Sequence, residues 1–227
     1  MTHALSGLAA VRHECGEAYT LVRDQGFSIT RTTVFERRPL ADAWARPLAP
    51  VTFRFGSAAD IKSLTAEIHD YGAAEKRFSL ARLEQGDSLV VAECEGGIVF
   101  YGWLMYGQID LDQNVTVPIA PDAVYSYKLF TIPRARGLRI CSGYYHFVAS
   151  SIAERGYRRL ICRIAPGNRP SVRGHLCAGF QPCGTLWKVV AVRRAYYLAD
   201  GRMRSWLQTI SPRGDLGKAS LLRKQQM

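Results

Sequence analysis

The chain has 227 residues, of which 48% are hydrophobic, so it is long and apolar enough to bury a sizeable core and is unlike a disordered chain. Its six cysteines lack the paired spacing of metal sites, and no apolar run reaches the length of a membrane span. These features favour a cytoplasmic protein with reduced thiols and no metal. The net charge of +11 is uneven, because residues 134–227 hold eighteen basic and three acidic side chains. The imbalance indicates an anionic partner.

The first fifty residues predict a helix over 8–25 and a strand over Phe27–Phe35, where apolar and polar residues alternate. We expect residues 1–50 to form an N-terminal extension that helps to build an acceptor pocket or a homodimer. From residue 200 onward the pattern dissolves, so residues 200–227 are expected to form a polar tail.

Residues 51–106 alternate between strand and helix patterns. A strand over 51–55 is followed by Ser57 and Asp60, which are spaced like a capping box. The helix they begin has an apolar face, made by Ile61, Leu64 and Ile68. A short helix over 79–85 and a hairpin with strands at 88–94 and 98–106 follow.

The second half predicts a crossover between parallel strands. A polar loop over 108–122 leads into a strand that is stopped by Pro133. The predicted elements that follow are a helix over 140–155, a strand over 157–164, a short helix from Pro170 to Gly179 and one long strand over 185–199. A strand, helix and strand in this order demand a partly parallel sheet covered by helices, so the fold class is mixed α/β.

The turn between that first strand and helix is unusually basic. Its sequence, PRARGLRICSGYY, places Arg134, Arg136 and Arg139 around Gly137. A helix N-terminus already carries partial positive charge, so three cations there are unfavourable unless an anion binds. Backbone N–H groups at the helix start together with arginines suit a phosphate group.

The chain here resembles the GNAT superfamily of N-acyltransferases. Pro133, Arg136 and Gly137 match the family's cofactor motif, and the stretch from Asn168 to Phe180 resembles its Asn and Gly-Phe segment. The resemblance covers roughly 51–198, which we expect to be an acyltransferase domain over 51–199. Two residues depart from the family's small residues, namely Arg139 and Cys141.

The resemblance implies an enzyme that moves an acetyl or other acyl group from acyl-CoA to an amine, on a mostly antiparallel sheet with one parallel crossover and helices on both faces. The cofactor-binding residues it implies are Phe130, Thr131, Ile132, Arg134, Arg136, Gly137, Leu138, Arg139, Ile140, Cys141, Ser142 and Asn168.

Transfer to an amine also needs a base and an acid. The strand before Pro133 contains no carboxylate, so the base is missing or lies elsewhere; Glu93, Asp110, Asp112 and a water chain are the candidates. His175 occupies the position where the family often has a Tyr, which implies a general acid that protonates the thiolate. The alternative is a histidine packed at a helix end.

Two other functions fit the basic half of the chain. The acyl group could come from acyl carrier protein, an acidic partner. A non-enzymatic protein that binds nucleic acid or an anionic membrane is the other, although the sequence lacks a recognition-helix motif. The amine acceptor is not identified by the sequence.

Overall fold

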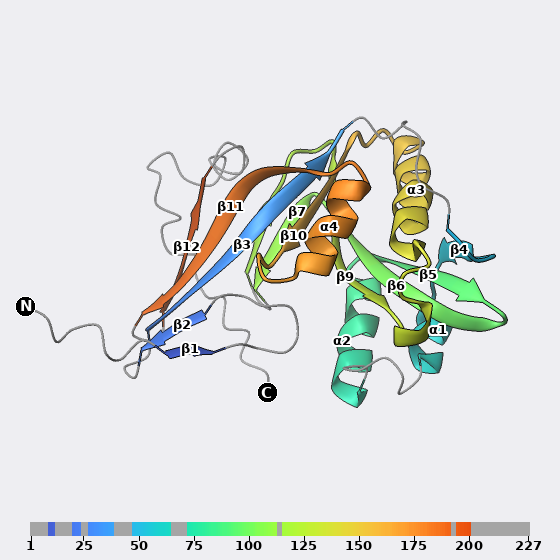
Figure 1. Cartoon of the computed structure of the whole chain (residues 1–227), viewed down its shortest axis with the longest axis horizontal. Helices are drawn as coiled ribbons and strands as arrows, with labels where there is room; N and C mark the ends of the chain where they lie inside the picture. The colour runs from blue at the N-terminus through green and yellow to red at the C-terminus, as the bar shows by residue number, and fades with distance from the viewer. Residues whose placement is uncertain are drawn as a thin grey trace, which may run out of the picture.

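A computed structural model describes residues 9–11, 20–23, 27–38, 47–64, 72–112, 115–191 and 194–200. These residues form a mixed α/β fold in which a large sheet has mostly antiparallel strands and a single parallel pair, with helices on both faces (Figure 1). The fold class predicted from the sequence is therefore confirmed. Among the described residues, no helix is long and apolar enough to cross a membrane.

The elements follow one another along the chain with these bounds. The strands are β1 Ala9–Val11, β2 Thr20–Arg23, β3 Phe27–Arg37, β4 Thr52–Phe55, β5 Ser88–Cys94, β6 Gly97–Tyr106, β7 Gln108–Asp112, β8 Val115–Pro118, β9 Ala123–Thr131, β10 Arg159–Ile164, β11 Gln181–Ala191 and β12 Arg194–Ala199. The helices are α1 Ala58–Ser63, α2 Ala73–Glu84, the 3₁₀ turn η1 Pro133–Ala135, α3 Ile140–Ala153 and α4 Arg169–Cys177.

Strand β3 lies in the middle of the sheet, although it belongs to the expected N-terminal extension. One of its edges pairs with β11, and the other pairs with β2 and then with β10. On the far side of β10 the order continues through β9, β6 and β5 to β4. Residues 27–37 therefore belong to the same sheet as the acyltransferase-like segment.

The two faces of the sheet carry different helices. Ser126 on β9 lies 2.9 Å from the hydroxyl of Tyr144, which places α3 on one face. The next residue, Tyr127, accepts a hydrogen bond from Arg82 of α2 on the opposite face. We call these the α3 face, which α4 also covers, and the α2 face (Figure 1).

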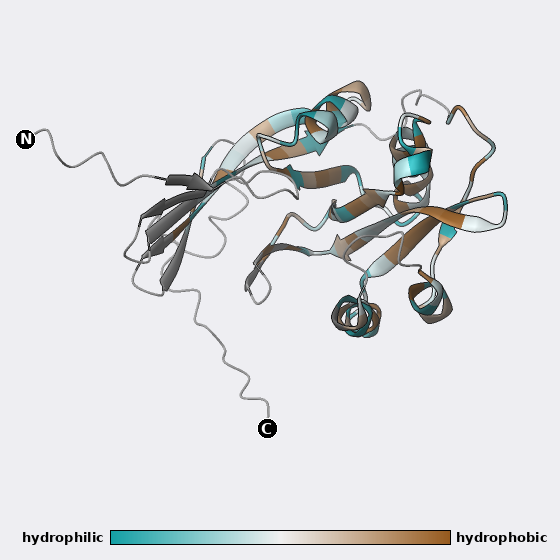
Figure 2. Cartoon of the chain, turned by 60° about the horizontal axis from the view of Figure 1, so that its bottom comes forward, coloured by the Kyte–Doolittle hydropathy of each residue, from teal (hydrophilic) through white to brown (hydrophobic). Residues whose placement is uncertain are grey.

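The core consists of apolar side chains between the sheet and its helices, and Figure 2 shows hydrophobic residues along the central strands. The predicted apolar stripe of the 140–155 helix is confirmed, because four of its five residues are fully buried and the fifth, Phe147, packs against the core. The buried four are Ile140, Tyr144, Val148 and Ile152.

Several sequence predictions are wrong at this level. Strands β1 and β2 occupy parts of the predicted 8–25 helix. The predicted polar loop over 108–122 contains the two-stranded sheet β7–β8, and the single predicted strand over 185–199 is the antiparallel pair β11–β12. In each case strand pairing, which local periodicity does not report, decides the structure.

Helix lengths differ as well. Helix α1 ends at Ser63, so it includes Ile61 of the predicted apolar face but stops before Leu64, and Ile68 lies outside the described residues. Helix α2 begins at Ala73, six residues before its predicted start, because Gly72 serves as its N-cap. The 88–106 hairpin, the β9 strand and the α3 helix agree with their predictions within a few residues. The expected polar tail lies outside the described residues from 201 onward.

Candidate active site

Strands β9 and β10 separate partway along their length. Their parallel pairing runs from Ala123 with Arg159 to Ser126 with Cys162, and no later pair is formed. Beyond it, β9 continues to Thr131 alongside β6, while β10 continues to Ile164 alongside β3. The two parallel strands thus form a fork that opens toward their carboxyl ends.

The β9 edge that faces the fork carries backbone groups without a strand partner. Ile132 donates its N–H to the carbonyl of Val99 in β6, at 3.0 Å. Because successive residues of a strand direct these groups to opposite edges, Thr131 directs its own toward the fork. The guanidinium of Arg136 donates to the Thr131 carbonyl there, at 3.2 Å. Arg136 therefore lies at the open end of the fork.

The basic turn connects the end of β9 to the start of α3. Arg134 lies in η1, and Arg136 and Arg139 follow it, all with exposed side chains. Gly137 and Arg139 both adopt left-handed backbone conformations, with φ of 84° and 56°. Glycine takes this conformation without strain, whereas arginine does so at a cost. Arg139 thus adopts a backbone conformation that favours glycine.

Helix α3 begins without a capping side chain and without an acidic residue in its first turn. The carbonyl of Arg139 accepts from the N–H groups of Ser142 and Gly143, at 3.1 and 3.2 Å. Earlier N–H groups of a helix have no partner within it. The start of α3 is therefore a positive end that is suited to an anion, with arginines beside it.

The remaining predicted cofactor residues lie in or next to this turn, except Asn168. Phe130 lies 5.9 Å from the Arg136 guanidinium, the carbonyl of Leu138 accepts from Leu48, and burial raises the pKa of the Cys141 thiol to about 12. Asn168 lies at the start of α4, where its side chain accepts from the Ser171 N–H at 3.2 Å. Contact of any of these residues with a cofactor stays a prediction.

His175 belongs to α4, and its side chain is buried between α4 and α3. Its Nδ1 is 2.7 Å from the carbonyl oxygen of Ser171, and its Nε2 is 2.5 Å from the hydroxyl of Tyr145. A carbonyl only accepts, so Nδ1 carries the proton and Nε2 accepts from Tyr145. Burial lowers the pKa of His175 to about 4. These contacts favour the packed alternative, and the general-acid role stays a prediction.

On the α2 face, the first residue of β9 beyond the paired region carries a polar network. Tyr127 donates its hydroxyl proton to Asp87, and Arg82 donates to the Tyr127 oxygen at 2.7 Å and to Asp87 at 3.3 Å. Burial, and then the bond to Asp87, raises the pKa of Tyr127 well above its ordinary value. The Asp87 carboxylate thus contacts β9 by its hydrogen bond with Tyr127, although no residue of β9 itself is acidic.

A bulge in β9 follows at once. Lys128 has φ of 49°, and the pairing with β6 shifts register opposite Gly102. Simple alternation along β9 would place Lys128 on the same face as Ser126, and the structure differs. The Lys128 ammonium lies 2.5 Å from Glu75 and 4.9 Å from the centre of the Phe78 ring, both on α2. The bulge therefore turns Lys128 onto the face of Tyr127.

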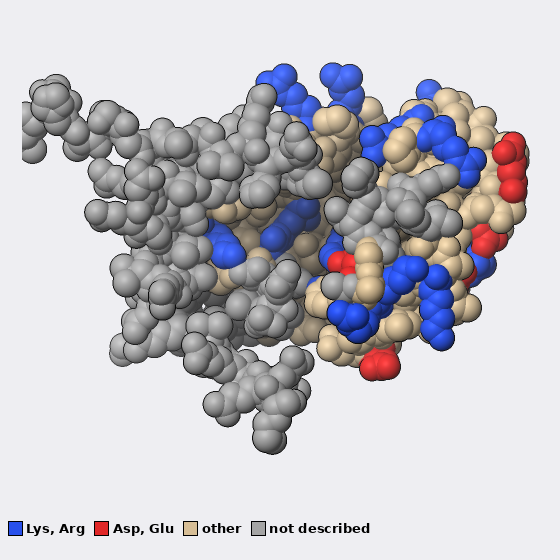
Figure 3. All heavy atoms as spheres, turned by 90° about the horizontal axis from the view of Figure 1, so that it is seen from below, with Lys and Arg blue, Asp and Glu red and all other residues tan. Residues whose placement is uncertain are grey.

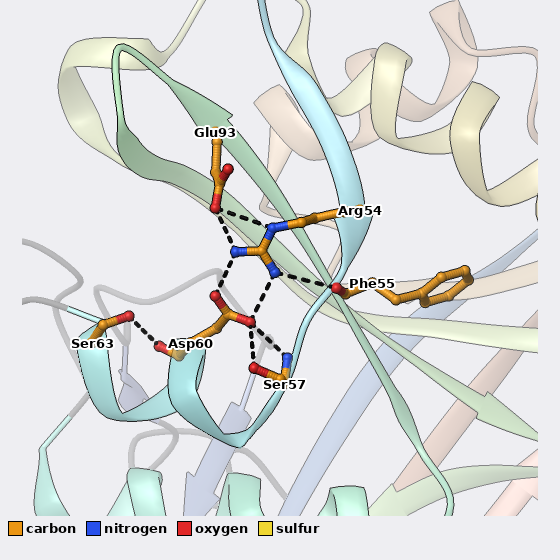
Figure 4. Close-up of polar contacts among 6 residues, drawn as sticks. All are labelled: Arg54, Phe55, Ser57, Asp60, Ser63 and Glu93. Atoms are coloured by element: carbon orange, nitrogen blue, oxygen red, sulfur yellow. Dashed lines mark hydrogen bonds and ion pairs between the residues drawn. The ribbon is translucent and has the colours of Figure 1, made fainter.

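Glu93, one of the candidate bases, is held by Arg54 at the far edge of the sheet. Figure 4 shows the Arg54 guanidinium between Glu93 and Asp60, at 2.5 and 2.6 Å. The same arginine keeps the pKa of Asp60 well below its ordinary value, and Asp60 accepts from the Ser57 N–H at 2.7 Å. This network fixes the start of α1, as the capping-box spacing predicted.

The other two candidate bases, Asp110 and Asp112, lie in β7, and their side chains are outside the described residues. Asp87 was not among the site residues predicted from the sequence. Its position just before β5 gave no local signal, because its partner Tyr127 is 40 residues away in the chain.

No family model matches the chain, and no curated protein matches it in sequence. Over a segment, the structure resembles GNAT acetyltransferases. A predicted acetyltransferase with acetyl-CoA from Clostridium acetobutylicum is 18% identical, with 58% of this chain and 90% of that chain covered and a TM-score of 0.42. A tandem GNAT protein from the clavulanic acid biosynthesis pathway is 15% identical. The likeness covers 81% of this chain and 62% of that chain, with a TM-score of 0.49.

A third solved structure, a functionally unknown conserved protein from Staphylococcus epidermidis, is 10% identical to this chain. The likeness covers 72% of this chain and 62% of that chain, with a TM-score of 0.49. The chain therefore spans less than two thirds of the length of this structure and of the tandem protein. These comparisons describe a likeness of fold.

Proposed function

We propose that this protein is an acyltransferase that moves an acyl group from acyl-CoA to an amine. The observation that carries the proposal is the meeting of two features at one place: the fork between β9 and β10 and the basic, uncapped start of α3. Backbone groups in the fork that have no strand partner can hydrogen-bond the extended thioester arm of acyl-CoA. Three arginines at the start of α3 can pair with the phosphates of the same molecule. The resemblance of residues 51–198 to GNAT motifs supports the same donor.

In this proposal, the pyrophosphate lies on the first turn of α3 with Arg136 beside it, and the thioester lies along the unpaired edge of β9. A backbone N–H on that edge, such as that of Thr131, donates to the thioester carbonyl as negative charge develops on its oxygen. The cofactor supplies the acyl group as an activated thioester.

Tyr127 and Asp87 are the proposed proton acceptors for the amine. The Tyr127 oxygen takes a proton from the attacking nitrogen while its own proton passes to Asp87, so a tyrosinate does not accumulate. The C–N bond forms, the C–S bond breaks, and the thiolate takes a proton from solvent. Arg82 donates to both the Tyr127 oxygen, at 2.7 Å, and Asp87, at 3.3 Å, and so holds the two acceptors in place.

Calorimetric titration with acetyl-CoA and with longer acyl-CoAs tests the donor. We expect saturable binding that weakens with added salt, since charged contacts are screened. Mass spectrometry of small molecules released from the purified protein gives an independent measurement. Failure of every acyl-CoA to bind at high protein concentration would overturn the proposal.

A further inference from the structure

The fork opens onto the α2 face as well as toward α3. Side chains alternate between faces along a strand. Cys162 pairs with Ser126 of β9, whose side chain contacts Tyr144 of α3, so Cys162 points to the α3 face. The next residue, Arg163, therefore points to the α2 face, as does its cross-strand neighbour Val34. Arg163 is half-buried and is the first residue of β10 beyond the paired region.

Tyr127 holds the matching position on β9. It is the first residue beyond the last β9–β10 pair, and it points to the α2 face toward Arg82 and Asp87. On the α2 face, the fork thus has Tyr127 with its carboxylate partner on one strand and Arg163 on the other. One strand of the fork therefore carries a proposed proton acceptor, and the other carries a cation.

A second cation lies farther along the same face. Lys188 on β11 pairs with Thr30 on β3, an even-numbered position like Val34, so it also points to the α2 side. Figure 3 shows this face hollowed beside α2, over the central strands, with Lys and Arg side chains in the hollow. Basic side chains therefore gather on this part of the α2 face.

From this arrangement we infer that the acceptor binds on the α2 side of the fork and is an amine that also carries an anionic group, a carboxylate or a phosphate. The inference rests on the proposed function and adds the class of acceptor. The amine lies at Tyr127, where its proton leaves, and the anion lies at Arg163. A guanidinium pairs with either anion through two parallel hydrogen bonds.

The acceptor class is tested with pairs of amines that differ in the anionic group alone. Carboxylate pairs are L-leucine with L-leucinamide and L-phenylalanine with L-phenylalaninamide, and the phosphate pair is 2-aminoethyl phosphate with ethanolamine. With acetyl-CoA as donor, we expect the anionic member of at least one pair to have a kcat/KM about tenfold to a hundredfold higher, as a charged hydrogen bond supplies. The carboxylate and phosphate arms show which anion is preferred.

The matched variants are Arg163→Gln and Arg31→Gln. Arg31 lies on β3 with the same charge but on the opposite face, over the ring of Trp187 at 5.3 Å. We expect Arg163→Gln to reduce the preference for the anionic member to about twofold, chiefly through KM, and Arg31→Gln to keep it. Thermal melting of both variants checks that the fold is intact.

The experiments distinguish failure of the proposed donor from failure of the proposed acceptor class. Acetyl-CoA titrated without an amine tests the proposed function, whereas calorimetry of the same amine pairs without a donor tests the acceptor site. A preference for the neutral member, a preference that survives Arg163→Gln, an equal loss in Arg31→Gln, or binding of neither member of any pair would each overturn the inference.

Discussion

The imidazole of His175 donates its Nδ1 proton to the carbonyl oxygen of Ser171, one helical turn earlier in α4. This bond fixes the tautomer, so Nε2 accepts from Tyr145 and the ring is neutral inside the protein. Because burial lowers the folded pKa to about 4, the unfolded chain, with a pKa of about 6.5, binds the proton first as the pH falls.

Stability should therefore be complete above pH 6.5 and decrease as the pH falls toward 4, by on the order of 3 kcal/mol from this residue. Urea unfolding at a series of pH values measures it, and His175→Gln should flatten that part of the profile. We expect His175→Phe to lower stability but to preserve turnover of the folded protein. A loss of about 10²–10⁴ in turnover would instead assign the general-acid role.

Arg136→Ala should weaken CoA binding by about tenfold to a hundredfold, because a charged hydrogen bond to phosphate is lost. Arg158, exposed beyond the other end of α3, provides the control variant Arg158→Ala, which should bind CoA like the wild type. An equal loss with dephospho-CoA would place the contact at the pyrophosphate. Unchanged affinity for both ligands would show that the motif register is mistaken.

Arg139→Gly should raise the free energy of unfolding by about 1 kcal/mol, because glycine adopts a φ of 56° without strain. The same change should weaken CoA binding if the arginine faces phosphate. Arg139→Ala separates the two effects, since it removes the charge and keeps most of the backbone strain. Equal stability of the glycine and alanine variants in urea would contradict this account.

Lys128→Ala should destabilise the protein by roughly 1 kcal/mol, because it removes the contacts to Glu75 and Phe78 that favour the bulge while keeping its positive φ. Lys128→Gly loses the same contacts but tolerates that backbone, so it should be the more stable of the two in thermal melts. Amide hydrogen exchange of residues 127–131 reports whether the bulge persists in each variant.

Tyr127→Phe should reduce turnover by about 10²–10⁴ with CoA affinity unchanged, because the proton path from the amine to Asp87 is broken. Tyr125, which stacks on Tyr127 at 5.4 Å on the same face, supplies the control Tyr125→Phe. Activity of Tyr127→Phe close to that of the wild type would remove this residue from the mechanism.

The fold was predictable where local signals agree with strand pairing. Gly96 and Gly97 mark the β5–β6 hairpin, and Pro133 ends β9. The β11–β12 hairpin was missed because Val192 and Arg193, between the two strands, are not turn-forming residues. Apolar spacing over 8–25 resembles a helix, but two of its segments pair as strands.

The candidate site was predictable only along one continuous stretch. Residues 130–142 contain the turn, its glycine and its arginines, so these residues are close in the sequence as well as in the structure. The contact between Asp87 and Tyr127, and the positions of Arg163 and Tyr127 across the fork, join distant segments. Simple alternation also failed at Lys128, because a bulge adds a residue to the strand.

The central position of β3 has a consequence for synthesis and folding. This strand is translated early, yet it pairs with β10 at Leu160 and with β11 at Gln181, each more than about a hundred residues later. Such distant pairing slows folding, because a long loop must close before the contact forms. Most of the chain must leave the ribosome before the middle of the sheet is filled. Until then one edge of β3, and the part of the other edge beyond its pairing with β2, have no strand partner, and such unpaired edges favour aggregation.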